Sequence, residues 1–575
     1  MKTFFLAVCL TALSFVYSQN CNCDVTLTGL SSTSLNLIWA SQIAYAPGDT
    51  ICIPAGTHAG LRFYDFKGTA TQPLTFINCN GQVVIDEPQY AGIEFKGSEY
   101  IRLTGTGDTG YDRGIKVIGT GGGAAGVYLT ALSTDIEVDH IEVDGAGFAG
   151  LMAKTDPICS DSLTWRSSGF IMKNLDIHHN VFKNTGGEGI YIGFTKGYKL
   201  DTGRNCSGTN VYGHWLEHVH VHHNTLEDIG WDAIQLSLVR TDGKIYDNYI
   251  YNYGTENRYF QDFSISFSGG TYEVYNNISI NGPLDYGQGF QSINGQSGTK
   301  VFNNVIVRPQ LHGIFMHPRH DFEDPNEGYY IANNTIIEPE RAGTHYNTTL
   351  IHPIDPADLY QPQSSVPTYF VNNLIVDPGY DFEGSNTWKQ NQESYFDFNE
   401  RATRDSLLNN IYSNILTRQM DTLGLTDIAN YDYSPASSSS AVVDEGSNLS
   451  SWGITFDLEN LTRPSGTAFD VGAFEYQSSG STLLANLSPT FGPKEEATTQ
   501  MRLYPNPAPG SFVLADQKGQ SQKLRLQIVQ LSGAIVWEKT YQTGAVVDVS
   551  SLQKGLYLLR ISGEAIEETH RLIIR

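Results

Sequence analysis

Ile177-His178-His179-Asn180 recurs along the chain as Val221-His222-His223-Asn224 and Ile245-Tyr246-Asp247-Asn248. Five later runs end in an Asn pair instead: Asn276-Asn277, Asn303-Asn304, Asn333-Asn334, Asn372-Asn373 and Asn409-Asn410. The final asparagines of successive runs are 24 to 44 residues apart, about one coil of a solenoid whose turns absorb insertions. Asn tolerates the left-handed backbone of a tight turn, and its amide can donate to a carbonyl of the next coil. The repeat predicts an all-β fold, a right-handed parallel β-helix with a ladder of stacked Asn side chains. Asn-rich turns of a β-sandwich are the alternative.

A short alternating strand follows each of these turns and forms a second column. Its third and fifth residues are mostly apolar and should point into the solenoid, which leaves the fourth residue outside. The strands begin at Ala59, Ala91, Ala125, Ala149, Glu188, Asp232, Asp262, Gln288 and His312. The outward residues include Arg62, Glu94, Tyr128, Tyr191, Gln235, Gln291 and Phe315. Aromatic rings and amides on one long flat face suit a sugar polymer. We therefore expect a polysaccharide-binding set made of Lys154, Tyr191, Gln235, Gln291 and Phe315.

Residues 1–18 have the pattern of a signal peptide. Lys2 is followed by an apolar core from Phe4 to Val16, and Val16-Tyr17-Ser18 provides a cleavage site. No later run approaches the roughly 20 apolar residues that a membrane-spanning helix needs. The formal net charge is −25 and no basic block occurs, which disfavours nucleic acids and anionic membranes as partners. We expect an exported, soluble monomer without a membrane-spanning segment.

Six cysteines follow the signal peptide: Cys21, Cys23, Cys52, Cys79, Cys159 and Cys206. An even number in an exported chain permits disulfides, and buried free thiols are the alternative. Cys159 and Cys206 lie in insertions that leave the same strand of consecutive coils, so we predict that they pair. The four N-terminal cysteines would then pair among themselves.

Two segments resemble known exported β-helix proteins. Residues 47–76, which begin Pro47-Gly48-Asp49-Thr50-Ile51, resemble the opening of many β-helix polysaccharide lyases and related secreted proteins. Residues 469–475 resemble the closing segment of exported β-helix proteins of the Bacteroidetes type. These resemblances imply a β-helix domain over residues 19–476. Residues 477–500 are rich in Ser, Thr and Gly and indicate a linker.

Residues 501–575 have short alternating strands between turn signals, which predicts a small β-sandwich. Leu503-Tyr504-Pro505-Asn506-Pro507, Leu531-Ser532-Gly533 and the run from Gly555 to Ile561 occur in this order. They resemble the type A sorting domain of the type IX secretion system. The resemblance implies recognition by that secretion machinery, passage through the periplasm and across the outer membrane, and then release or attachment at the cell surface. A carbohydrate-binding β-sandwich is the alternative.

Acids begin three consecutive strands of the second column, and Gln288 and His312 continue it. Coils stack about 4.8 Å apart, so Glu188 and Asp232 should lie about 5 Å apart, and Glu188 and Asp262 about 10 Å. Retaining glycosidases place their carboxyls about 5–5.5 Å apart and inverting ones roughly 6.5–9.5 Å apart. Two charges 5 Å apart repel by roughly 3 kcal/mol at an effective dielectric of about 20. A shared proton, a bound divalent cation or a nearby base must offset that repulsion. The acids are either catalytic or acceptors of backbone hydrogen bonds in a solvated turn, and no other cofactor is indicated.

The column also resembles the polygalacturonase family, in which acids and a His-Gly pair precede the same short strand. The resemblance puts Glu188 and Asp232 on the acidic positions and His312-Gly313 on the His-Gly pair. The chain departs from the family at Trp231, which stands where a second acid is found, and His312 lies three coils beyond Asp232 instead of one.

A polysaccharide lyase needs a base and a cation for the uronate carboxyl. Lys96 and Lys154 leave the second-column strands of early coils. His312, His317, Arg319 and His320 lie together in a later coil. His317 and Arg319 could serve as base and neutralising cation, or this segment is a polar surface turn.

His218, His220 and His222 alternate with Val219 and Val221, with Asp176 and His178 on the preceding coil. Alternation places the imidazoles outward on one face. They could bind zinc or another transition metal, or they form a metal-free stack on the surface.

These observations favour a secreted or cell-surface protein that cuts a polysaccharide, by hydrolysis first and by elimination second. A non-catalytic adhesin or glycan-binding protein is the third hypothesis. An enzyme should hold Glu188, Asp232, Asp262 and His312 in a cleft walled by residues 154–170, 194–213 and 318–328. An adhesin should present an open face with unremarkable acids.

Overall fold

The computed structural model describes residues 22–195, 203–258, 261–282, 286–293, 298–317, 329–339, 349–351, 368–377, 397–398 and 410–477. In the C-terminal part it describes residues 501–504, 511–516, 523–530, 535–543, 545–553, 555–563 and 567–574. The chain forms two compact units, residues 1–481 and 482–575, and each is described by itself.

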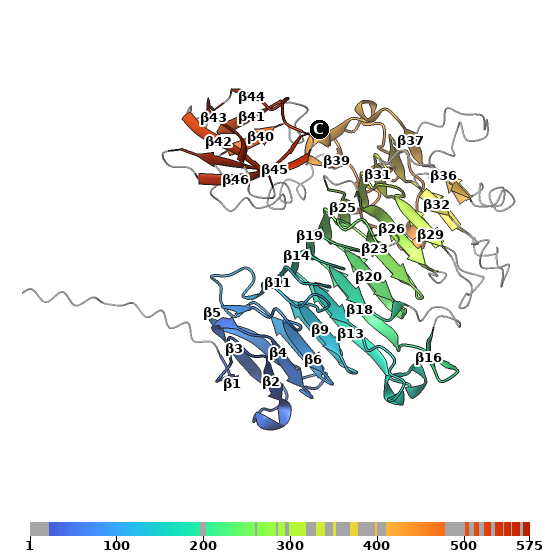
Figure 1. Ribbon diagram of the computed structural model, residues 1–575. Helices are drawn as coiled ribbons and strands as arrows, with labels where there is room; N and C mark the ends of the chain where they lie inside the picture. The colour runs from blue at the N-terminus through green and yellow to red at the C-terminus, as the bar shows by residue number, and fades with distance from the viewer. Residues whose placement is uncertain are drawn as a thin grey trace, which may run out of the picture. The chain divides into compact units, whose positions relative to one another are not determined.

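The first unit is a parallel β-helix, as the repeat predicts (Figure 1). One side, called the groove face below, is a 12-stranded parallel sheet that starts with strand β2 and ends with strand β35. Its strands are β2 (Asn36–Trp39), β4 (Leu61–Tyr64), β6 (Ile93–Lys96), β9 (Val127–Thr130), β12 (Leu151–Ala153), β15 (Ile190–Ile192), β20 (Ile234–Ser237), β23 (Phe263–Ser268), β26 (Gln288–Ile293), β29 (Ile314–His317), β32 (Thr349–Ile351) and β35 (Asp397–Phe398).

The other two sides belong to one 23-stranded sheet, because the long strand β5 (Leu74–Ile85) pairs with strands of both sides. Before this turn run β3 (Thr50–His58), β5 (Leu74–Ile85), β7 (Glu99–Thr104), β10 (Thr134–Asp139), β13 (Ile171–His178), β18 (Trp215–His222), β21 (Val239–Tyr246), β24 (Tyr272–Tyr275), β27 (Lys300–Phe302), β30 (Tyr329–Ala332), β33 (Thr368–Val371) and β36 (Ile411–Tyr412). After it run β8 (Ile115–Val117), β11 (Ile141–Asp144), β14 (Val181–Thr185), β19 (Thr225–Ile229), β22 (Tyr249–Tyr251), β25 (Ile278–Ile280), β28 (Val305–Val307), β31 (Thr335–Ile337), β34 (Leu374–Val376) and β37 (Ile415–Thr417). The short strand β1 (Val25–Thr26) pairs with β3.

The predicted Asn ladder is present and continuous over eight coils. Its members are Asn180, Asn224, Asn248, Asn277, Asn304, Asn334, Asn373 and Asn414. Asn277 shows the pattern: its Nδ2 donates to Asn304 Oδ1 at 3.0 Å and to the Ile245 carbonyl at 2.9 Å. The side-chain amide therefore bonds to the next amide and to a backbone carbonyl of the preceding coil, where we expected a carbonyl of the next.

Two details of the ladder prediction are wrong. The last member is Asn414 and not Asn410, because Ser413-Asn414 occupies the turn and Asn410 precedes β36. The left-handed residue is the one before each ladder Asn, such as His179 with φ 54° or Ser413 with φ 54°. The ladder Asn is selected for its amide, and the residue before it for its tolerance of positive φ.

The Asn pairs of the later coils have a second role that the repeat does not reveal. In the four pairs that the structure describes, the first Asn bonds to the closing segment, residues 447–475, which folds back over the ladder turns. Asn303 Nδ2 donates to the Phe456 carbonyl at 2.7 Å, and Asn333 Nδ2 to the Asp470 carbonyl at 2.9 Å. A fully buried ion pair between Arg463 and Glu475, 2.7 Å apart, holds this segment together. The segment that resembles a β-helix end therefore covers the side of the last coils.

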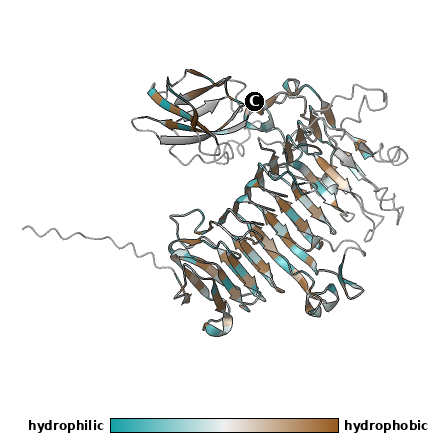
Figure 2. Ribbon diagram, in the orientation of Figure 1, coloured by the Kyte–Doolittle hydropathy of each residue, from teal (hydrophilic) through white to brown (hydrophobic). Residues whose placement is uncertain are grey.

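Inward side chains of all three faces fill the solenoid with a continuous apolar core, which appears as brown bands across the strands (Figure 2). In the first coils, Phe63 stacks on Phe95 at 4.9 Å, and both rings meet Phe76 edge-on. The alternation that predicts the strands also predicts this core.

The disulfide predicted between Cys159 and Cys206 is confirmed. It joins residues 154–170 to the hairpin of β16 (Arg204–Cys206) and β17 (Thr209–Val211). Near the N-terminus Cys23 pairs with Cys52, and Cys79 Sγ lies 3.8 Å from Cys23 Sγ. Cys21 and the predicted signal peptide lie outside the described residues.

The second unit is the predicted small β-sandwich. One antiparallel sheet contains β40 (Met501–Tyr504), β41 (Ser511–Asp516) and β44 (Val546–Asp548). The other contains β42 (Lys523–Gln530), β43 (Ile535–Gln542), β45 (Gly555–Ser562) and β46 (Glu567–Ile574). Phe512 and Val547 of the first sheet share a core with Leu526 and Leu559 of the second. Among the described residues of both units, no helix is long and apolar enough to cross a membrane.

Candidate functional site

The acidic column lies at the start of the groove-face strands, but its register differs from the prediction at one coil. Ile265 of β23 pairs with Ile234 of β20 and with Phe290 of β26. The column therefore runs Glu188, Asp232, Phe263, Gln288 and His312, and Asp262 lies one residue before it. Asp262 remains close to the column because Gln288 Nε2 donates to its Oδ1 at 2.8 Å.

The three acids are buried and hold their protons unusually tightly. Burial raises the pKa of Glu188 to about 7 and that of Asp262 to about 6. Burial, together with the charges of Glu188 and Asp262, raises the pKa of Asp232 well above its usual range. Asp232 Oδ1 accepts the Phe263 N–H at 2.8 Å, whereas Glu188 Oε2 has no hydrogen-bond partner among the described residues. The carboxyl of Glu188 is therefore buried and not solvated, whereas Asp232 accepts a backbone N–H as the turn alternative expects, so the catalytic role of these acids stays a prediction.

Cations and aromatic rings line the acidic column near Glu188. Lys154 Nζ lies 4.3 Å from the ring centre of Tyr191 and 3.2 Å from Asp156 Oδ1. Burial lowers the pKa of Lys154, but Tyr191 and Asp156 outweigh it and the pKa is raised, so the ammonium stays charged. Its positive charge partly offsets the rise in the pKa of Glu188.

Sequence reasoning did not predict three residues beside the acidic column: Phe148, Trp231 and Arg258. Arg258 lies 3.9 Å from the ring of Trp231, and that ring meets Phe148 edge-on at 5.4 Å. Trp231 replaces the second acid of the polygalacturonase pattern, so an aromatic ring takes the place of a carboxylate. The one signal for this contact in the sequence was the bulky Trp231 directly before Asp232. Arg258 lies in a turn, and hydrophobic periodicity does not predict where turn residues lie.

The predicted polysaccharide-binding residues lie side by side on the groove face, but they do not form an open surface. Tyr191 is 9% exposed, and Gln235, Gln291 and Phe315 are likewise buried. Phe315 stacks on His312 at 5.2 Å and on Phe263 at 6.5 Å, and Ser266 Oγ donates to Gln291 Oε1 at 3.2 Å. Phe263 and His312, the large side chains of the acidic column, thus cover outward residues of the groove-face strands. The alternation pattern alone cannot predict this coverage.

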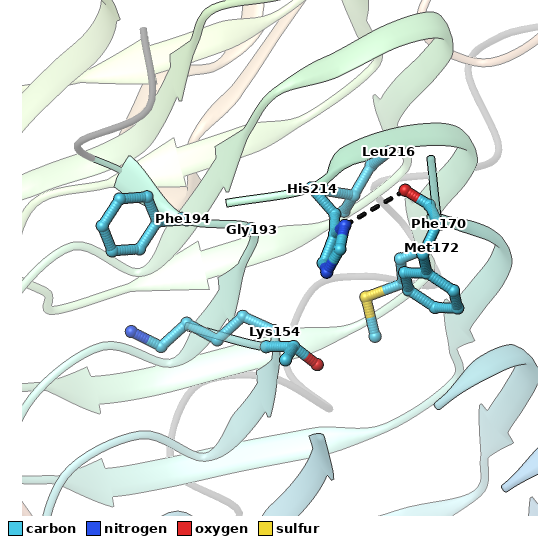
Figure 3. A pocket seen from close by; sticks show the side chains of 8 residues that line it. Lys154, Phe170, Met172, Gly193, Phe194, His214 and Leu216 are labelled. Carbon is cyan, nitrogen blue, oxygen red and sulfur yellow. Dashed lines mark hydrogen bonds between the residues drawn. The ribbon is translucent and has the colours of Figure 1, made fainter. Parts of the chain in front are cut away.

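A small cavity of about 10 Å³ adjoins Lys154 and has room for about one water molecule (Figure 3). Phe170, Met172 and Leu216 line it, and His214 Nδ1 bonds to the Phe170 carbonyl at 3.1 Å. The Lys154 side chain runs along one wall, and its ammonium points away from His214 (Figure 3). The cavity is too small for a sugar. It lies where the two ends of the insertion, residues 154–170, join the β-helix.

The second predicted cluster is only partly described. His312 lies in the column, as expected, and His317 is the last residue of β29. The side chain of His317 and the residues 318–328, including Arg319 and His320, lie outside the described residues. Their roles as base and cation stay predictions.

The histidine cluster lies on β18, which belongs to the 23-stranded sheet and not to the groove face. Its imidazoles point outward, as alternation predicts. Asp242 Oδ2 lies 3.1 Å from both His218 Nδ1 and His220 Nε2, and His222 Nε2 lies 2.9 Å from Asp176 Oδ1. Carboxylates of neighbouring coils hold each imidazole, and metal binding stays a hypothesis.

A comparison with known protein families identifies the C-terminal unit. Residues 502–575 match the family described as secretion system C-terminal sorting domain. No curated protein matches the chain in sequence.

Solved structures that resemble the chain include two lyases. One is an alginate lyase from Paenibacillus sp. str. FPU-7, with 17% identity, a TM-score of 0.33 and coverage of 52% of this chain and 97% of the other. The other is a mannuronic acid specific family 6 polysaccharide lyase from human gut microbiota, with 14% identity, a TM-score of 0.30 and coverage of 66% and 95%. The chain is a parallel β-helix protein that carries a type IX sorting domain and is delivered to the cell surface or the extracellular space.

Proposed function

We propose that the β-helix cleaves a polysaccharide by glycoside hydrolysis at Glu188, Asp232 and Asp262. The observation that carries this proposal is the raised pKa of three buried carboxyls on consecutive coils. Hydrolysis needs one carboxyl that is protonated near neutral pH and one that is ionised, and strongly perturbed acids in close proximity supply both. The pKa of Asp232, raised well above its usual range, suits the proton donor, and Asp262, with a pKa of about 6, is ionised at neutral pH.

In the proposed reaction Asp232, which keeps its proton, donates it to the glycosidic oxygen as the bond from that oxygen to the anomeric carbon breaks. A water molecule adds to the anomeric carbon and gives a proton to the carboxylate of Asp262. Glu188 maintains the proton on Asp232 through its charge. A proton passed back to Asp232 restores the starting state, and one water is consumed for each bond cut.

The surrounding residues suit a sugar ligand in this proposal. The rings of Tyr191 and Phe315 and the amides of Gln235 and Gln291 are groups of the kinds that bind sugars, although their side chains are buried here. Because Tyr191 and Lys154 contact each other beside Glu188, they would hold the sugar next to the acids.

Elimination is a second candidate, favoured by the same contact between Lys154 and Tyr191. A charged ammonium can neutralise a uronate carboxyl, and a phenol oxygen beside it can take or return a proton. Elimination leaves an unsaturated product that absorbs ultraviolet light, whereas hydrolysis leaves a new reducing end without that absorbance.

The test combines a polysaccharide panel with Asp232→Asn. We expect turnover to fall by about 10²–10⁴-fold, while fold and polymer binding persist, because Asn keeps the shape but cannot give up a proton in this role. Asp247→Asn is the matched control: the pKa of Asp247 is also raised by burial, to about 6, but this residue lies at a ladder turn. Unchanged turnover in Asp232→Asn would remove the acids from the mechanism. Binding without any turnover in the wild type would instead identify a glycan-binding protein.

A further inference from the structure

The outward side of the groove face changes character towards its N-terminal end. Around the acidic column the outward side chains are covered. On β2, in contrast, Leu37 is 52% exposed and Trp39 is 39% exposed, and Tyr90, in the turn before β6, is 47% exposed. Figure 1 shows β2, β4 and β6 side by side at this end of the helix. Large apolar side chains left open on one face mark a surface for a partner.

Trp39 and Tyr64 form a rigid aromatic platform on this surface. They are cross-strand partners in β2 and β4, and their rings stack at 3.9 Å with an interplanar angle of 7°. Because β2 is the terminal strand of the sheet, no further strand of this sheet covers the Trp39 ring face that points away from Tyr64. An indole face held in this way suits the apolar face of a sugar ring.

A polar cavity of about 420 Å³ lies where the chain enters β2, β4 and β6, at the opposite end of these strands from Trp39 and Tyr64, and Tyr90 is one of its lining residues. Hydroxyls of Ser32, Thr33 and Ser34 line one wall, and Gln89 and Tyr90 line another. Its lining is mostly polar, and its volume falls in the range of small-molecule sites.

Both walls of the cavity are fixed before any ligand arrives. Ser31 Oγ accepts the N–H groups of Thr33 and Ser34, and Glu87 Oε1 accepts those of Gln89 and Tyr90. Glu87 Oε2 also accepts the Gly60 N–H at 3.0 Å. A Cβ on Gly60 would lie 2.8 Å from the Ala91 carbonyl and 2.9 Å from Leu35, so the close approach of the walls needs glycine.

Arg62 connects the cavity to the platform. Its guanidinium lies 5.8 Å from the Tyr90 ring centre and forms an ion pair with Glu94, and Arg62 is the cross-strand partner of Leu37. Lys96, the next residue of the platform row, also pairs with Glu94 at 3.3 Å. Glu94 pairs with both cations, and with Asp86 and Glu87 at the cavity the carboxylates outnumber the cations on this surface. The surface therefore does not attract a polyanion.

We propose that Trp39, Tyr64, Leu37, Tyr90 and the adjoining cavity bind a neutral polysaccharide chain at a site separate from the acidic column. This inference deepens the proposed function, on which it rests for the link to cleavage. At about 4.8 Å per coil, the four coil steps from β4 to β15 separate the platform from Glu188 by roughly 19 Å along the axis, and five residues of strand add roughly 17 Å across it, about 25 Å in all. Several sugar units can span that distance, so one chain can contact both sites.

The test measures binding of neutral hexasaccharides from xylan, mannan and β-glucan, and of a uronate hexasaccharide, by calorimetry. The full chain with Asp232→Asn serves as background, so that turnover cannot consume the ligand. We expect at least one neutral ligand to bind, and Trp39→Ala and Tyr90→Ala each to weaken it by about tenfold or more. Tyr111→Ala is the matched control, because Tyr111 is 44% exposed and lies outside this surface.

Several outcomes would overturn the proposal. Wild-type affinity in both Trp39→Ala and Tyr90→Ala would do so, and so would stronger binding of the uronate ligand than of any neutral one. Association of two copies that Trp39→Ala abolishes would show that the surface belongs to a dimer. If Trp39→Ala lowers the melting temperature, Tyr90→Ala still decides, because Tyr90 lies in an exposed turn. Platform-dependent binding without cleavage in the wild type would support this site and reject the proposed hydrolysis.

Discussion

The Asn ladder and the acidic column are both stacks of buried polar side chains at turns of the same coils. Only in the ladder do the stacked side chains provide one another's hydrogen-bond donors and acceptors. Asn277 donates to Asn304 and accepts from Asn248, and each neighbour does the same. In the column, Glu188 leaves one oxygen unpaired, and Phe263 interrupts the series at the next coil but one. An amide is both donor and acceptor, so identical copies complement one another along the axis. A carboxylate only accepts, so stacked acids need protons or cations between them.

This difference explains why the ladder suits stability and the column suits chemistry. A column of acids costs folding free energy, because burial and mutual repulsion disfavour the ionised form. The same cost produces carboxyls that titrate near neutral pH. The ladder offers no such group, since an amide does not titrate.

Conversion of one ladder Asn into an acid should have the largest effect on stability. We expect Asn277→Asp to lower the free energy of unfolding by about 4 kcal/mol at pH 7, because it removes buried donors and leaves an unpaired buried charge. Urea unfolding of the β-helix measures this loss. Acid pH should restore part of it, since a protonated Asp donates one hydrogen bond.

Asn210→Asp is the control for this change, because Asn210 lies exposed in the β16–β17 hairpin and should cost less than about 0.5 kcal/mol. Equal losses at the two positions would contradict the view that the ladder depends on its donors.

The pH dependence of stability should show the opposite property of the column. The folded-state pKa of Glu188, about 7, lies above its ordinary value of 4.5, so the folded chain binds this proton more tightly than the unfolded chain. The contribution of Glu188 to the free energy of unfolding is therefore fully present below pH 4.5. It falls as pH rises towards 7, by up to about 3 kcal/mol. Glu188→Gln should remove this fall, so the difference between variant and wild type should grow from pH 5 to pH 8.

Two other groups titrate in the opposite sense and must be separated from Glu188. Burial and neighbouring imidazoles lower the pKa of His179 and His223 to about 4. Their contribution is lost as pH falls below about 6.5, but it cancels in the difference between variant and wild type. Glu99→Gln, at an exposed ion pair with Lys67, is the control that should leave the profile unchanged. Parallel profiles for Glu188→Gln and wild type would show that Glu188 ionises normally.

The comparison also shows what the sequence could and could not predict. Hydrophobic alternation and recurrent asparagines predict the coils, because each coil imposes the same inside–outside pattern on its residues. Asp262 is predicted one residue wrong because the prediction aligned the acids of consecutive coils, whereas the alternation of Phe263, Ile265 and Phe267 itself marks the register that the structure has. The recurrent asparagines also favour Asn410 over Asn414, since an Asn just before β36 and an Asn just after it look alike until the hydrogen bonds are known.

The closed state of the candidate site was equally hidden. Alternation assigns Tyr191 and Phe315 to the outside of the sheet, which is correct, but it does not tell whether neighbours cover that outside. Coverage comes from Phe148, Trp231 and Phe263, whose positions depend on turns of irregular length. Long-range packing of this kind follows from tertiary structure and not from local periodicity.

The smallest expected effect separates the middle of the ladder from its end. Asn414 Nδ2 donates to the Phe370 carbonyl at 2.9 Å, and its Oδ1 accepts the Asn373 backbone N–H at 2.8 Å and the Asn373 Nδ2 at 3.0 Å. The structure describes no ladder member beyond it, and the side chain is only half-buried. Water can therefore replace partners that are lost at this position. We expect Asn414→Ala to cost about 1 kcal/mol and Asn277→Ala about 3 kcal/mol in urea unfolding. Hydrogen exchange of the Asn373 amide should accelerate in Asn414→Ala while the amides near Asn277 stay protected. Equal costs at both positions would mean that the shape of Asn at the turn, and not the chain of amides through buried coils, stabilises the helix.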